Sequence, residues 1–215
     1  MRIGVLGTGG VGRTIATKLV ELGHEVTMGS RTHDNESAAE WVASAGAGAA
    51  QGTFADAAAF GELVVNCTSG AGSVEALRAI PREHLSGKTL VDVANPLDFS
   101  GGALSLFTEI DDSLAEQLQR EHPEAHVVKT LNTVNANVMV EPARVPGAHD
   151  VFVCGNDDRA KAEVVELLEG FGWPREHVLD LGDLAAARGL EAYLLLWIRL
   201  RGLTGTSDFN IRVVR

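Results

Sequence analysis

The sequence has few of the residues on which metal sites and reactive thiols depend. Its two cysteines, Cys67 and Cys154, lie in separate apolar runs typical of strands and form no CxxC pair. We expect both to be small buried hydrophobic residues, and free thiols suit a reducing cytosol. His122 and His126 stand four residues apart, but Pro123 would break a helix between them. The sequence therefore predicts no metal site.

Positive charge is also scarce. The chain of 215 residues has 18 lysines and arginines against 29 aspartates and glutamates, a formal net charge of −11. Proteins that bind nucleic acids or anionic membrane surfaces do so through clustered basic residues. The charge balance therefore argues against both kinds of partner, although a single local arginine could still hold a phosphate.

Long apolar runs are absent. The most apolar stretch of the later sequence, 192–198, is far shorter than the roughly 20 residues that cross a membrane. The N-terminus leads directly into a strand-like segment, 3–6, without the charged and apolar regions of a secretion signal. We therefore expect a cytoplasmic protein with no membrane partner.

The chain does contain an alternation of strand-like and helix-like segments. The expected strands are 3–6, 24–28, 63–67, 89–94, 126–131, 151–154, 178–181 and a closing strand at 211–214. The expected helices begin near Val11, around Trp41, at Ser73, after Asp111 or Asp112, after Asn156 and before Leu190. This alternation predicts an α/β fold, a Rossmann-like doubly wound and mostly parallel sheet covered by helices on both faces. We expect a single domain, with a core at about 1–140 and a small C-terminal α/β extension at about 141–215.

The first strand ends in a glycine-rich turn that opens the first helix. The turn reads Gly7-Thr8-Gly9-Gly10-Val11-Gly12 and matches the GxGxxG pattern in its required context. Gly7 would permit the tight turn, Gly9 would let a pyrophosphate approach the backbone, and Gly12 would let helix and strand pack closely. Free N–H groups of the helix would then face the anion. The pattern predicts a dinucleotide site, and the alternative is a turn with no ligand.

The end of the second strand indicates which dinucleotide binds. Enzymes that use NAD place a carboxylate here for the ribose hydroxyls, whereas this chain has Gly29-Ser30-Arg31-Thr32 and no carboxylate before Asp34. A carboxylate would repel a 2′-phosphate, and Arg31 can donate two hydrogen bonds to one. Ser30, Thr32 and Thr8 add hydroxyl donors. We therefore predict NADP, the alternative being a polar turn with a solvated arginine.

Three further strand ends are candidates because ligands of such sheets bind at the carboxyl edge. Cys67-Thr68-Ser69 should border the middle of the cofactor, and Asn95-Pro96 should approach the nicotinamide. Asn132-Thr133-Val134-Asn135-Ala136 should form the floor or wall of the substrate cleft. The alternative for each is an ordinary turn, in which Asn, Ser and Pro are common.

At this point the sequence resembles the NADP oxidoreductases that depend on coenzyme F420, and also the NADPH-binding domain of flavin-linked metalloreductases. The resemblance rests on 7–12, 23–25, 29–31, 95–97, 128–133, 150–158 and 211–214. It implies that Thr8, Gly9, Gly10, Val11, Ser30 and Arg31 bind NADP, that Ala136 lies beside the nicotinamide, and that 132–136 face the deazaflavin. The chain departs from the family at Asn35, where a basic residue is common, and at Asn132 and Asn135, where His and Pro are usual.

Together these features predict an enzyme that moves a hydride between NADPH and a small-molecule acceptor, coenzyme F420 or a flavin. Such transfer needs stacked rings more than acid–base help, and the sequence identifies no general acid. Two alternatives remain open: an imine or carbonyl reductase, and a non-catalytic NADPH-binding module. The apolar segment 190–198 further predicts a homodimer.

Overall fold

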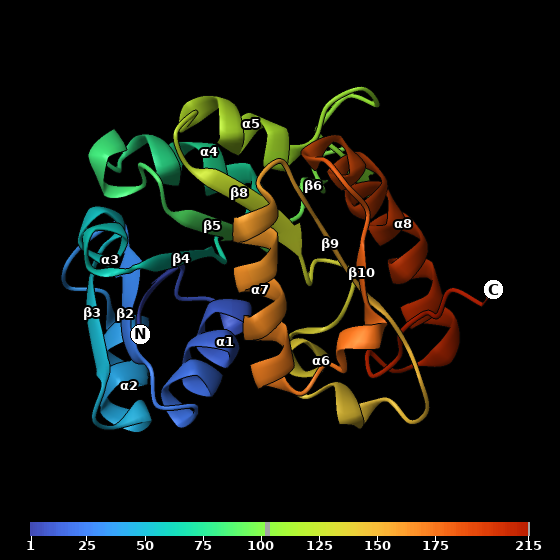
Figure 1. Ribbon diagram of the computed structural model, residues 1–215, viewed down its shortest axis with the longest axis horizontal. Helices are drawn as coiled ribbons and strands as arrows, with labels where there is room; N and C mark the ends of the chain where they lie inside the picture. Colours follow the sequence, from blue (N-terminus) through green and yellow to red (C-terminus); the bar gives the residue numbers. More distant parts are fainter. Residues whose placement is uncertain (102–103, 215) are drawn as a thin grey trace.

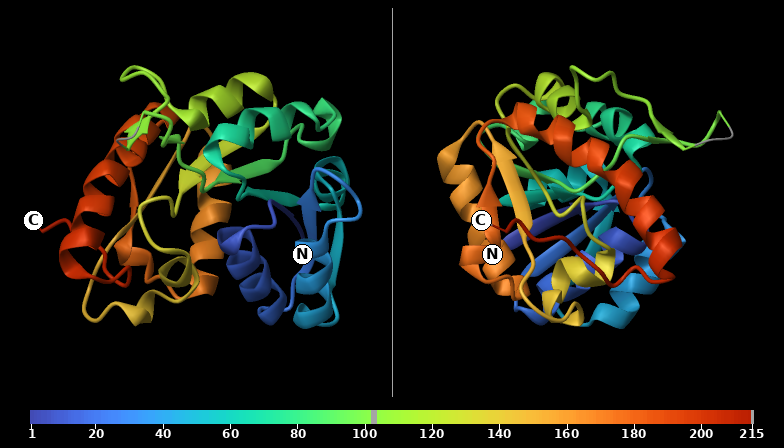
Figure 2. Two further views of the ribbon diagram at one scale, coloured as in Figure 1. Left: turned by 180° about the vertical axis from the view of Figure 1, so that it is seen from behind. Right: turned by 90° about the vertical axis from the view of Figure 1, so that its right-hand side faces the viewer.

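The computed structural model describes residues 1–101 and 104–214. Within them, eight strands form one sheet in the order β10-β9-β8-β5-β4-β1-β2-β3 (Figure 1). The strands are β1 (Arg2–Leu6), β2 (Glu25–Ser30), β3 (Ala49–Thr53), β4 (Leu63–Asn66), β5 (Thr89–Asp92), β8 (His126–Thr130), β9 (Val151–Gly155) and β10 (Val178–Asp180). Neighbouring strands are parallel except β8 and β9. A separate antiparallel pair, β6 (Leu97–Asp98) and β7 (Ser105–Leu106), lies apart from this sheet (Figure 2).

Helices cover both faces of the sheet. They are α1 (Gly10–Glu21), α2 (Glu36–Ala45), α3 (Phe54–Phe60), α4 (Gly70–Arg78), α5 (Leu114–Glu121), α6 (Ala136–Val140), α7 (Asp158–Phe171) and α8 (Ala187–Thr204). Short 3₁₀ turns lie at η1 (Arg82–His84), η2 (Pro142–Arg144), η3 (Arg175–His177) and η4 (Leu184–Ala186). This confirms the predicted Rossmann-like α/β class. No helix in the described part of the chain is long and apolar enough to cross a membrane.

Two hydrophobic clusters form the core, one on each side of the sheet. The first gathers side chains of α1, α2, α6 and α7 and includes Trp41 and Trp173, which are 3% and 1% exposed. The second gathers side chains of α3, α4, α5 and α8. Cys67 and Cys154 are buried and free, and burial raises the pKa of the Cys154 thiol to about 12. Burial raises the pKa of the Cys67 thiol as well, so both cysteines are buried as predicted, and neither thiol is activated.

The predicted closing strand at 211–214 is wrong. The segment has no regular structure and is held by isolated contacts: the Asp150 N–H donates to the Ile211 carbonyl, and the Val213 N–H donates to the Asp150 carboxylate. The reason is topological, because β9, which follows Asp150, already has β8 on one side and β10 on the other. The tail therefore has no free edge there to extend as a strand.

The sequence analysis also missed β3 and α3. Their alanine-rich segment carries no apolar alternation, but it does contain a helix start at Thr53, whose hydroxyl accepts a hydrogen bond from the Asp56 N–H. Helix α4 begins at Gly70, three residues before the expected Ser73, and two further helix starts differ from those expected by one or two residues. Ser113 caps α5 in place of Asp111 or Asp112, and Asp157 caps α7 in place of Asn156.

Candidate active site

The glycine-rich turn lies between β1 and α1, at the carboxyl edge of the parallel strands (Figure 1). Gly7 has a φ of +113°, and a Cβ there would lie 2.7 Å from the Cys67 carbonyl oxygen. Its N–H donates to the Gly29 carbonyl at 2.9 Å, which ties the turn to the end of β2. Only glycine combines this backbone conformation with such a close approach.

Beyond Gly7, the loop has free space beside its backbone. A Cβ at Gly9 or Gly10 would meet no atom within 4 Å, whereas one at Gly12 would overlap the Gly7 carbonyl. Gly9 precedes α1 as its N-cap without a side-chain cap, so the first N–H groups of this helix are unbonded by side chains. Space beside the backbone and free donors at a helix start are what a pyrophosphate requires. The turn therefore fits the dinucleotide that the sequence predicts.

The turn after β2 presents an arginine. The buried Ser30 hydroxyl donates to the Thr32 carbonyl and accepts from the Thr32 N–H, so it holds the turn closed. Arg31 and Thr32 are exposed. Within residues 1–101 and 104–214, Arg31 has no hydrogen-bond or ion-pair partner, and its guanidinium is available for a ligand. Ser30 thus shapes the turn that presents Arg31, and its contact with the phosphate stays a prediction.

Replacing Arg31 by alanine should weaken NADPH binding by roughly ten- to a hundredfold, because a hydrogen bond to a charged group contributes about 1.5–3 kcal/mol. NADH lacks the 2′-phosphate, so its affinity should change little. Calorimetric dissociation constants for both nucleotides at fixed salt measure the effect. Arg78→Ala, which removes an exposed arginine paired with Glu121, is the control. Equal weakening of NADPH and NADH would show that Arg31 is structural.

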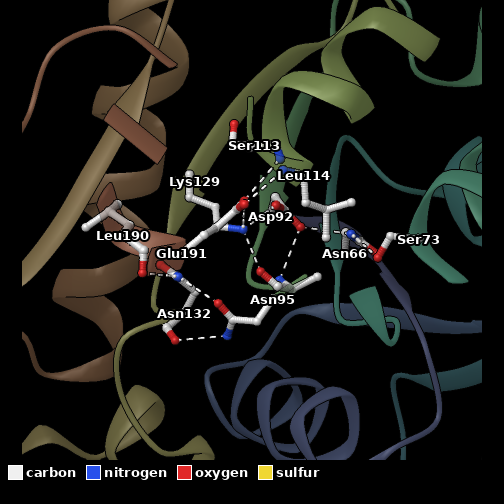
Figure 3. A network of polar contacts seen from close by, with 12 residues as sticks. Asn66, Ser73, Asp92, Asn95, Ser113, Leu114, Lys129, Asn132, Leu190 and Glu191 are labelled. Carbon is white, nitrogen blue, oxygen red and sulfur yellow. Dashed lines mark hydrogen bonds and ion pairs between the residues drawn. The ribbon is translucent and has the colours of Figure 1, made fainter. Parts of the chain in front are cut away.

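The ends of β5 and β8 are joined by an exchange of amide hydrogen bonds (Figure 3). Asn95 Nδ2 donates to the Asn132 carbonyl at 3.0 Å, and Asn132 Nδ2 donates to Asn95 Oδ1 at 2.9 Å. Asn132 Nδ2 also donates to the Leu190 carbonyl on α8 at 3.0 Å. Asn132 is 2% exposed, so its amide holds the loops together.

The other predicted residues gather at the same edge with different exposures. Thr68 is half-buried, and its hydroxyl donates to Asn66 Oδ1 at 2.6 Å. Ser69 is the exposed N-cap of α4. Asn135 caps the short helix α6, which begins at the half-buried Ala136. Seven members of the predicted set are buried: Gly12, Ser30, Cys67, Pro96, Asn132, Thr133 and Val134.

Sequence reasoning missed a buried charge cluster beneath these loops (Figure 3). Lys129 on β8 donates through Nζ to Asp92 Oδ2 at 2.8 Å and to Glu191 Oε1 at 2.9 Å. The three side chains are at most 1% exposed. Burial alone would lower the pKa of Lys129, but Asp92 and Glu191 outweigh it and hold that pKa above its ordinary value. Burial raises the pKa of Glu191, and Lys129 opposes this.

A second missed residue is Gly70, the first residue of α4. A Cβ there would overlap the Asn95 carbonyl oxygen and would lie 2.6 Å from the Asn95 carbonyl carbon and 3.2 Å from Pro96 Cα. The loops after β4 and β5 therefore touch at this glycine. The only available signal was a glycine three residues after a strand, which many turns share.

A hollow of about 470 Å³ at the opposite edge of the sheet is a weaker candidate. Its charged lining has two basic side chains, Lys88 and Arg159, against four carboxylates, those of Glu62, Asp157, Glu163 and Glu166. These acidic side chains would repel the phosphates of a dinucleotide. The carboxyl edge of the strands therefore remains the predicted place for the cofactor.

The fold and the glycine loop are those of a Rossmann-like α/β protein with a turn suited to a dinucleotide. The family of NADP oxidoreductases dependent on coenzyme F420 matches residues 2–96. A solved structure from Arthrobacter sp. FB24, provisionally assigned as an F420-dependent NADP-reductase, is 51% identical, has a TM-score of 0.92 and covers 99% of both chains. The chain belongs to this family, as the sequence resemblance indicated.

Further relatives carry names that describe different reductases. The F420-dependent NADP reductase of Methanocaldococcus jannaschii is 29% identical over 74% of this chain and 70% of its own length. The metalloreductase STEAP3 of Rattus norvegicus is 31% identical over 89% of this chain, which spans only 36% of that protein. A reductive aminase from Aspergillus terreus in complex with NADPH, 20% identical with a TM-score of 0.65, shows a shared fold alone.

Proposed function

We propose that this protein transfers a hydride between NADPH and a deazaflavin, coenzyme F420, or a flavin-like acceptor. In this proposal the glycine turn holds the pyrophosphate, Arg31 holds the 2′-phosphate, and the nicotinamide lies against Asn95 and Ala136. The acceptor occupies the side formed by 132–135. NADPH supplies the hydride when bound, and the chain supplies the binding site and the orientation.

The observation that carries the proposal is the character of the strand ends after β5 and β8. The amides of Asn95 and Asn132 are bonded to one another, and the one lysine close to them, Lys129, is enclosed between carboxylates. Within the described residues these groups are occupied with one another, so none of them is free to donate a proton to a substrate. Hydride transfer between two stacked rings needs the reacting carbons about 3–3.5 Å apart and little acid–base assistance.

The relatives support the same acceptor class. The proteins from Arthrobacter and Methanocaldococcus jannaschii carry F420 in their names and match most of this chain. An imine reductase would need a proton donor for the amine nitrogen. Tyr193, the chain's only tyrosine, is on α8, and its buried hydroxyl has no hydrogen-bond partner in the described residues.

The test is a panel of acceptors offered to the purified protein with NADPH under anaerobic conditions. We expect NADPH oxidation with bleaching of coenzyme F420 or of a free flavin. Turnover of a cyclic imine or a ketone would support the carbonyl and imine alternative. Reduction of a ferric chelate without flavin would place the protein with metalloreductases. NADPH binding without oxidation by any acceptor would identify a binding module and overturn the proposal.

The homodimer and the cytoplasmic location stay predictions. On α8, Leu196 and Leu203 are 54% and 82% exposed, and a second copy of the chain is our proposed cover for them. Light scattering at micromolar concentration reads out the oligomeric state directly.

A further inference from the structure

We propose that Lys129, Asp92 and Glu191 are positioning residues for the nicotinamide end of the cofactor, and that Glu191 gives the C-terminal helix α8 a part in hydride transfer. This inference rests on the proposed function. It assigns to the C-terminal extension a role beyond covering the sheet.

The first step of the argument concerns Ala94, which directly precedes Asn95. Its N–H donates to Asp92 Oδ1 at 3.2 Å, and its carbonyl accepts from Lys129 Nζ at 2.5 Å. Both backbone groups of this one residue are thus held by charged members of the cluster. The direction in which the chain leaves β5 is therefore set by the Asp92–Lys129 pair.

The cluster reaches the neighbouring strand end as well. Asn66 at the end of β4 donates through Nδ2 to Asp92 Oδ1 at 2.9 Å, which fixes the orientation of its amide. The Asn66 oxygen then accepts from both the N–H and the hydroxyl of Thr68. Asp92 thereby orients Thr68 through Asn66. Hydrogen bonds within a buried chain of this kind are strengthened by the low local dielectric.

Glu191 connects the cluster to two further elements. Besides Lys129, its carboxylate accepts the N–H groups of Leu114 and Ala115 at 2.9 and 3.2 Å, at the start of α5. The residue before it, Leu190, supplies the carbonyl that binds the Asn132 amide. One turn of α8 thus holds the loop after β8 and the charged groups beneath the loop after β5 (Figure 3).

Within the described residues, no hydrogen bond joins the cluster to the turn at Ser30–Thr32, where the adenosine end of the cofactor is proposed to lie. Ser30 and Thr32 form hydrogen bonds with one another, and the Gly7 N–H donates a hydrogen bond to the Gly29 carbonyl. A disturbance of the cluster should therefore reach the nicotinamide half of the cofactor and leave the 2′-phosphate half intact. This separation provides a measurement that a general loss of stability would not reproduce.

The experiment compares binding of intact NADPH with binding of the fragment 2′,5′-ADP, by calorimetry, in Lys129→Met and Glu191→Gln. We expect NADPH to bind about tenfold more weakly in both variants and 2′,5′-ADP to bind within twofold of the wild type. Lys161→Met is the matched control, since Lys161 is also a nearly buried lysine between two aspartates, Asp158 and Asp180, at the other edge of the sheet.

The outcomes separate the two proposals. If the wild type binds neither ligand, the proposed function fails. If the wild type binds both, and the variants weaken both ligands equally or neither of them, the cluster is only structural and this inference fails. Lys129→Met leaves two buried carboxylates unpaired and is the variant at risk of unfolding. Glu191→Gln keeps the Lys129–Asp92 pair, so its NADPH-to-fragment ratio decides the question.

Discussion

A Gly9→Asp variant should bind NADPH at least about a hundredfold more weakly than the wild type and yet unfold at the same temperature. The backbone tolerates the change because Gly9 has a φ of −74° and no atom lies within 4 Å of an added Cβ. Aspartate is moreover a favourable N-cap, so α1 should lose no stability. The carboxylate would stand where the pyrophosphate approaches. Like charges about 4–5 Å apart repel by roughly 3–4 kcal/mol at an effective dielectric constant of 20.

The matched control is Gly202→Asp on α8. Gly202 is exposed, an added Cβ would meet no atom within 4 Å, and the change in net charge is identical. The NADPH dissociation constants of both variants and the wild type are measured by calorimetry, and their melting temperatures are measured by circular dichroism. NADPH binding by Gly9→Asp within fivefold of the wild type would show that the pyrophosphate does not lie on this loop.

The glycine loop was predictable because its signals are local. A strand, a GxGxxG turn and an amphipathic helix follow one another within some twenty residues, and each constrains the same short stretch of backbone. The same holds for Arg31, whose place after β2 follows from counting along the chain. Neither prediction needed knowledge of which distant residues meet.

The elements that were missed or wrong depend on distant context. The alanine-rich segment 49–53 becomes the strand β3 only because β2 offers it a free edge. Conversely, 211–214 has the apolar alternation of a strand, but β9 already has a partner on each side. Whether a segment forms a strand depends on whether a sheet edge is free to pair with it. The local sequence pattern does not contain that information.

The charge cluster could be predicted from the sequence only in part. Asp92 and Lys129 were visible as charged residues inside apolar strands, which predicts that each has a buried partner. The partners stand 37 and 62 residues from Lys129, and Glu191 lies in a helix whose sequence reads as simply apolar. The sequence could therefore indicate that a buried pair exists, but not that it supports the loops of the site.

The second large effect is a slower hydride transfer, expected when Gly70 is replaced. At this residue α4 meets the loop after β5. In Gly70→Ala the new methyl group would lie 2.6 Å from the Asn95 carbonyl carbon and would overlap the carbonyl oxygen. Backbone atoms on both sides must move apart, since no flexible side chain can yield. The displaced loop carries Asn95 and Pro96, which we place against the nicotinamide. Misplacement of a reacting group by about 1 Å can cost a hundredfold in rate.

We therefore expect single-turnover hydride transfer from NADPH to the acceptor found in the panel to slow by about a hundredfold in Gly70→Ala. Gly72→Ala, two residues further along α4, is the control, because an added Cβ there meets nothing within 4 Å. It should transfer hydride at the wild-type rate and gain up to about 1 kcal/mol of stability from the helical alanine. Binding of 2′,5′-ADP establishes that the Gly70 variant is folded. Equal rates in the two alanine variants would mean that the loop after β5 does not position the nicotinamide.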